Sequence, residues 1–166
     1  MATEIVSADS LDPIIRRKTL SARSPGSMLT EIDFGEYGVT FTDEPIPHGG
    51  TGEGPSPLQA VLGALCGCEA VTFNRTAADL DFSYEEINFE AEFTIDIRGR
   101  LGNQEVRPHF QTIRVQAIVT TDESEERTAE VVEETERRCP VYNLVVDAGV
   151  TLQMVWARRP TSSQEA

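Results

Sequence analysis

The stretch PLQAVLGALCGCEAVTFNRTAADL, residues 57–80, decides the fold of this chain. Ser56 is a suitable N-cap for a helix, and Pro57 suits the first helical position. Gly63 and Gly67 each cost a helix about 1 kcal/mol, so we expect them where another backbone approaches closely. Large apolar residues occur nearly all the way round the helix, which is typical of a buried helix. They are Leu58, Val61, Leu62, Leu65, Val71 and Phe73.

Segments on both sides of this helix have the pattern of strands. Residues 84–98 alternate apolar and polar with few errors, and residues 113–119 repeat the alternation, which predicts two half-buried strands. The intervening turn, residues 99–108, makes them antiparallel by hairpin logic. Before the helix, residues 20–42 predict two or three short strands joined by tight turns, and residues 43–56 form a loop rich in proline and glycine.

The C-terminal third predicts two helices and a last strand. Residues 122–138 are an acidic helix with a thin apolar stripe, and Cys139-Pro140 interrupts it. Proline can open a second, short helix with Cys139 close to its N-cap. Residues 150–156 then alternate as a strand. The order of elements predicts an α+β fold.

The length of 166 residues fits one domain. We expect that domain to span residues 20–158. Residues 1–19 are then an N-terminal tail, and residues 159–166 are a C-terminal tail.

The net charge excludes several classes of partner. Fourteen Lys+Arg against 28 Asp+Glu give a charge of −14, and Lys18 is the only lysine. Such a surface repels nucleic acid and anionic membranes. It suits either a protein hydrated in concentrated salt or an acidic cytosolic protein. No run approaches the ~20 apolar residues of a membrane span, and we see no secretory signal, so we expect a cytoplasmic protein.

Three cysteines are too few for a disulfide framework. In a reducing cytosol they are free thiols, either buried as small apolar residues or reactive. Cys66 and Cys68 point to nearly opposite sides of a helix, so at most one faces a given site. The dipole of the short helix could lower the pKa of Cys139, whereas Cys68 needs a cation, such as an arginine, from another element.

Two further features bear on the chemistry. The only histidines are His48 and His109, neither at ligand spacing from the cysteines, so no metal site is expected. Glu69 follows Cys68 inside the apolar helix. We expect it to reach an edge of the helix and be solvated, although it could instead contact the thiol site and handle protons.

Two motifs in this order resemble the OsmC/Ohr family. The first is GPSPLQAVLGALCGCEAVT, residues 54–72, and the second is CPVYNLV, residues 139–145, after an acidic helix. The resemblance covers about residues 20–158. It implies an OsmC-like fold, with antiparallel strands around a buried central helix, and an intertwined homodimer with active sites at the subunit interface.

The resemblance also implies a function, that of a thiol-dependent peroxidase acting on organic hydroperoxides without a cofactor. Cys68 matches the peroxide-attacking cysteine and Cys139 the resolving one, whose disulfide an external dithiol then reduces. Arg23 is the best match for the arginine that stabilises the thiolate. Cys66 occupies a position that is usually unreactive.

One departure from the family pattern supports other functions. Many members carry a glutamate just after the proline that opens the helix, whereas here Pro57 is followed by Leu58 and Gln59. Gln59 can hold an arginine through its amide oxygen but adds no charge, and Glu53 or Glu69 could supply the carboxylate instead. The alternatives are a non-enzymatic OsmC-fold protein that binds a small apolar or thiol ligand at the dimer interface, and a thiol enzyme acting on sulfur compounds.

Overall fold

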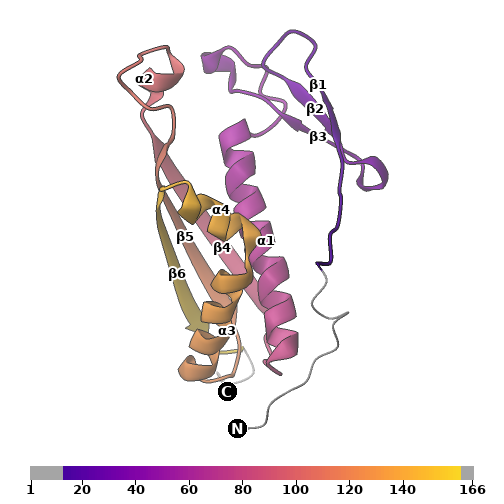
Figure 1. Ribbon diagram of the computed structural model, residues 1–166, viewed down its shortest axis with the longest axis vertical. Helices are drawn as coiled ribbons and strands as arrows, with labels where there is room; N and C mark the ends of the chain where they lie inside the picture. Colours follow the sequence, from indigo (N-terminus) through magenta and orange to yellow (C-terminus); the bar gives the residue numbers. More distant parts are fainter. Residues whose placement is uncertain (1–12, 162–166) are drawn as a thin grey trace. The chain divides into compact units, whose positions relative to one another are not determined.

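The computed structural model describes residues 13–161, and the chain divides into two compact units at Pro57. Figure 1 shows the elements of both. The outer parts of the two predicted tails, residues 1–12 and 162–166, lie outside the described residues. The predicted domain boundaries at residues 20 and 158 stay predictions.

The first unit holds a small antiparallel sheet, in agreement with the short strands expected over residues 20–42. Its strands are β1 (Ser21–Arg23), β2 (Thr30–Asp33) and β3 (Val39–Thr42), in that order. Positive-φ glycines form the turns between them, including Gly26 with φ 86° and Gly38 with φ 86°, because a side chain would be strained in that conformation.

One buried carboxylate organises the loop after β3. Asp43 is fully buried and accepts hydrogen bonds from Thr51 Oγ1 at 2.6 Å, from the Thr51 amide at 2.8 Å and from the Glu44 amide at 2.8 Å. These bonds, with the Thr51 hydroxyl first, lower the pKa of Asp43 to about 2. The loop that leads to the long helix is therefore held from within.

The second unit contains a three-stranded sheet in the order β4 (Glu86–Ile95), β5 (Phe110–Thr120), β6 (Thr151–Arg159). β4 and β5 are antiparallel, which confirms the predicted hairpin. β6 differs from the expected antiparallel arrangement, because it runs parallel to β5. The physical reason is the two-helix connection between them, which is long enough to return the chain to the end where β5 began.

The turn of the hairpin contains a short helix, where the alternating pattern predicted that the strand continues to residue 98. The strand ends at Ile95, and α2 (Ile97–Arg100) follows. The Asp96 side chain caps it by accepting a hydrogen bond from the Arg98 amide at 3.0 Å. Ile97, expected on the inward face of the strand, is therefore 54% exposed.

Three helices cover one face of this sheet (Figure 1). They are α1 (Pro57–Asp79), α3 (Glu125–Arg138) and α4 (Pro140–Asp147). The helix start at Pro57 and the break at Cys139-Pro140 are where the sequence predicts them. Alternate residues of β5 face these helices and are fully buried, as the alternation requires. They are Ile113, Val115, Ala117 and Val119.

The long helix α1 is buried along one stripe rather than all round. Val61 and Val71 are 41% and 54% exposed, so a single chain does not bury the helix on every side. Gly63 and Gly67 have no atom within 4 Å of where a side chain would begin. The buried stripe recurs every three or four residues, which is the helical period. Its members are Leu62, Leu65, Glu69, Phe73, Thr76 and Ala77.

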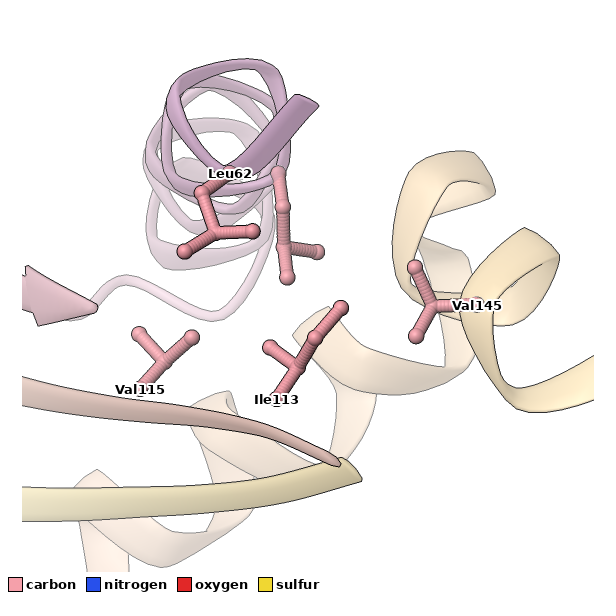
Figure 2. Packing of buried hydrophobic residues seen from close by; sticks show 5 residues of the cluster. Leu62, Ile113, Val115 and Val145 are labelled. Atoms are coloured by element: carbon pink, nitrogen blue, oxygen red, sulfur yellow. The ribbon is translucent and has the colours of Figure 1, made fainter. Parts of the chain in front are cut away.

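Two apolar clusters lie under this stripe. Figure 2 shows the first, in which Leu62 points from α1 towards Ile113 and Val115 of β5, and Val145 reaches in from α4. We call it the aliphatic cluster; its buried members are Leu62, Leu65, Ile113, Val115 and Val145. We call the second the aromatic cluster; its buried members are Phe73, Ala77, Phe82, Val119 and Val131.

Candidate active site

The candidate site lies midway along α1, between the two clusters. Leu65 of the aliphatic cluster and Phe73 of the aromatic cluster are the neighbouring stripe positions on either side of Glu69. Cys68 precedes Glu69, and because successive residues of a helix are about 100° apart it lies beside the stripe and is only partly buried. The helix thus presents a half-exposed thiol next to a buried carboxyl group.

Cys139 faces this part of the helix from the junction of α3 and α4. It is the N-cap of α4, where its Sγ accepts a hydrogen bond from the Tyr142 amide at 3.5 Å. Its side chain is fully buried. Pro140 fixes this position, because it cannot continue α3 and is suited to the first turn of a new helix.

The sequence suggested that the helix dipole could lower the pKa of Cys139, and this expectation was wrong. Burial first, together with the contacts with Glu69 and Cys68, raises its pKa to about 12, while only the Tyr142 amide opposes them. Forming a thiolate in low-dielectric surroundings beside a carboxyl group costs more free energy than a hydrogen bond from one N–H donor recovers. Cys139 is therefore a thiol, not a thiolate, near neutral pH.

The same contacts bring together the two cysteines that the sequence separates. Cys68 and Cys139 lie 71 positions apart, yet the Cys68 side chain is close enough to the Cys139 thiol to raise its pKa. Cys66 packs against the aliphatic cluster, as a small apolar residue would. Burial raises its pKa.

Glu69 departs most from expectation. The predicted solvated edge position was wrong, because the side chain is fully buried. Neither carboxyl oxygen has a hydrogen-bond partner among the described residues. Burial first, and the nearby Glu136 second, raise its pKa, while the Cys139 thiol is close enough to oppose them. The other possibility drawn from the sequence, contact with the thiol site, is what the structure has.

The sequence did not single out the residues behind Glu69. Glu136 of α3 accepts a hydrogen bond from Trp156 Nε1 at 3.1 Å. Burial and Glu136 raise the pKa of Tyr142 on α4. The spacing of Glu136, three residues before Cys139, was the available signal, because residues three apart share a helix side.

The other two predicted site residues lie elsewhere on the chain. Arg23 is an exposed residue of β1, in the first unit, paired in register with Glu31. Gln59 is exposed in the first turn of α1. Their expected roles beside Cys68 stay predictions.

Metal and membrane features are absent from the part of the chain that the structure describes. Residues 13–161 contain no group of three His, Cys, Asp or Glu side chains arranged to hold a metal ion. Within the same range, no helix has the length and apolar character to cross a bilayer.

The comparison with protein families shows which family carries this pair of motifs. The model of the OsmC-like protein family matches residues 50–155, nearly two thirds of the chain. The chain belongs to the OsmC-like family. The match contains both cysteine motifs and the buried helix, and it confirms the family resemblance read from the sequence.

Solved structures confirm the OsmC fold. An OsmC-like protein from Mycoplasma pneumoniae matches with a TM-score of 0.73 at 16% identity, over 89% of this chain and 99% of that one. The organic hydroperoxide resistance protein OhrB of Bacillus subtilis matches with a TM-score of 0.57 at 20% identity, over 85% and 98%. An organic hydroperoxide resistance protein OsmC from Legionella pneumophila matches with a TM-score of 0.60 at 16% identity, over 87% and 99%. No curated protein matches this chain.

Proposed function

We propose that this OsmC-like protein is a cysteine-dependent peroxidase that reduces organic hydroperoxides. The observation that carries the proposal is the contact between Cys68 and Cys139 across 71 residues of chain. Two thiols that meet, one partly exposed and one buried, are the arrangement that a dithiol peroxidase needs. Membership of the OsmC-like family, which includes proteins named for organic hydroperoxide resistance, supports the same chemistry.

The surroundings of the two thiols support an order of events. Cys68 is partly exposed, so a peroxide can reach it, whereas Cys139 is fully buried and has a pKa of about 12. The Cys68 thiolate attacks one peroxide oxygen, which gives a sulfenic acid and an alcohol. Cys139 then condenses with the sulfenic acid to form a disulfide and water, and an external dithiol restores both thiols.

Two parts of the proposal depend on other surfaces. Arg23, or another arginine, would stabilise the Cys68 thiolate, and Gln59 would hold that arginine through its amide oxygen. A homodimer would cover the side of α1 that carries the exposed Val61 and Val71. Both features follow from the family pattern, and a reducing cytoplasm would supply the dithiol.

The test measures consumption of cumene hydroperoxide with dithiothreitol as electron donor. Cys68→Ser should abolish turnover, and Cys66→Ser is the matched control that should keep it. Mass spectrometry after one equivalent of peroxide should detect a Cys68–Cys139 bridge, with Cys66 free. Unchanged turnover in Cys68→Ser would contradict the proposal.

A second candidate function is ligand binding without turnover, and one cavity favours it. An apolar cavity of about 110 Å³ lies at the start of α1, lined by Leu58, Phe110 and five further residues of the same unit. Ligand pockets usually measure ~300–1,000 Å³, so this one fits only a very small molecule. Thermal stabilisation by a small apolar thiol, without peroxide consumption, would favour this function over the first.

A further inference from the structure

The buried Glu69 has no role in the proposed reaction, although it occupies the centre of the thiol site. A carboxyl group with both oxygens unpartnered in a protein interior costs free energy. Glu69 has this arrangement: it is fully buried, and neither oxygen has a hydrogen-bond partner among the described residues. Such groups concentrate where chemistry requires them.

The resolving step requires two proton transfers, and a carboxylic acid can carry out both. Cys139 must lose its proton to attack, yet it is a buried thiol. The sulfenic acid on Cys68 must lose its oxygen, which leaves poorly as hydroxide and well as water. One proton therefore has to leave Cys139 while another arrives at the departing oxygen.

We propose that Glu69 is the proton relay of disulfide formation between Cys68 and Cys139. Glu69 lies next to Cys68 in α1, and Cys139 contacts both side chains. In the protonated state, one carboxyl oxygen donates its proton to the departing hydroxyl and the other accepts the proton of Cys139. This inference rests on the proposed peroxidase reaction and names a catalytic residue for its second step.

The step is balanced in atoms and electrons. The bond between the Cys139 and Cys68 sulfurs forms, and the S–O bond of the sulfenic acid breaks. The oxygen leaves as water, with its own hydrogen and the proton from Glu69. The proton of Cys139 then moves to the Glu69 carboxyl group. The Cys139 sulfur is oxidised and the Cys68 sulfur is reduced. Glu69 ends protonated, so no net charge is created in the interior.

The neighbours of Glu69 favour its protonated form. Burial and the carboxylate of Glu136 on α3 both raise its pKa, and only the Cys139 thiol opposes them. The other titratable groups that interact with Glu69 are Cys66 on α1 and Tyr142 on α4. None of these groups is a cation, which would favour the carboxylate.

The test separates the two chemical steps in a Cys66→Ser background. Trp156, the only tryptophan, is hydrogen-bonded to Glu136 beside the site, so its fluorescence can follow disulfide closure after a stoichiometric pulse of cumene hydroperoxide. Glu69→Gln keeps the shape and cannot relay protons. We expect unchanged trapping of the Cys68 sulfenic acid but closure slower on the order of 10²-fold at pH 6.

The pH profile distinguishes a relay from a structural role. Closure in the parent protein should be nearly independent of pH until Glu69 ionises, and then fall. Closure in Glu69→Gln should rise about tenfold per pH unit, because it depends on the small fraction of Cys139 thiolate. Glu136→Gln should keep the fast rate at low pH and shift the fall to lower pH, since it removes a charge that raises the pKa of Glu69.

A second assay keeps the relay testable without peroxidase activity. Cys68 is converted to a mixed disulfide with 2-mercaptoethanol, and release of that thiol by Cys139 is measured. In this exchange Cys139 again loses its proton, and the departing 2-mercaptoethanol thiolate gains one. Release of the thiol should therefore be slower in Glu69→Gln, with a steeper pH dependence. If the parent protein never forms a sulfenic acid but this assay shows the difference, only the peroxidase function fails. Equal rates and pH slopes in the two proteins would overturn the relay.

Discussion

The aliphatic and aromatic clusters are two halves of one core, and they differ in what fills them. In the aliphatic cluster, the buried side chains of α1, β5 and α4 are all aliphatic, and the aromatic rings packed against them are only partly buried. In the aromatic cluster, the Phe73 ring contacts Phe82, Tyr84 and Trp156 with centroids 5.1–5.9 Å apart. Glu69 lies in the stripe between them. The buried stripe of α1 therefore carries a carboxyl group at one position, the one next to the thiols.

The largest loss of stability should come from the aromatic cluster. Phe73 is fully buried and is the common partner of its three rings. Phe73→Ala leaves a ring-sized cavity and should lower the free energy of unfolding by about 3–5 kcal/mol. Urea denaturation followed by circular dichroism measures it. A loss under 1 kcal/mol would mean that the rings do not pack as described.

Leu65→Ala tests the aliphatic cluster in the same way. Leu65 is 1% exposed, and Leu65→Ala should lower the free energy of unfolding by about 2–5 kcal/mol, with the lower half expected because no contact between two rings is lost. The same denaturation assay applies, and the double variant with Phe73→Ala sharpens the comparison. If the clusters are independent, the two losses should add to within about 0.5 kcal/mol.

The position between the clusters should respond in the opposite direction. Glu69→Met keeps the length of the side chain and removes two unpartnered buried oxygens, so it should raise stability by about 1–3 kcal/mol. It should also slow disulfide closure as Glu69→Gln does. Slow closure in a more stable protein would exclude misfolding as its cause, whereas a destabilised Glu69→Met would show that the carboxyl group has structural partners.

The smallest expected effect is in the pH dependence of stability. The pKa of Glu69 is raised from its ordinary 4.5, so the folded state holds a proton that the unfolded state releases. Its contribution is fully present below pH 4.5 and is lost as pH rises through the folded pKa. Chemical denaturation of the parent protein and Glu69→Gln from pH 4.5 upward should show this decline in the parent protein alone.

Acid pH gives a contrast with the first unit. The lowered pKa of Asp43, about 2, means that its contribution is present above pH 3.8 and is lost as pH falls towards 2. Declines of stability on opposite sides of pH 4 would therefore report on the two units separately. If the loss of stability with rising pH persists in Glu69→Gln, a group other than Glu69 causes it.

Local patterns were enough for most elements of the fold. The alternation of residues 84–98 and 113–119 predicts β4 and β5, and proline at positions 57 and 140 predicts the starts of α1 and α4. The parallel pairing of β6 with β5 was not predictable in this way, because strand direction depends on where the connecting helices return the chain. Which side of α1 a single chain leaves exposed was not predictable, because apolar residues there do not reveal what covers them.

By itself, the sequence determined the element order, the two cysteine motifs and, through them, the OsmC-like family. Only the tertiary structure decided what surrounds the thiols. The sequence does not show whether Glu69 is solvated or buried. Glu136 and Tyr142 reach the site because α3 and α4 pack against α1. The pKa of a group depends on its three-dimensional neighbours, and so the proton chemistry of this site had to come from the folded chain.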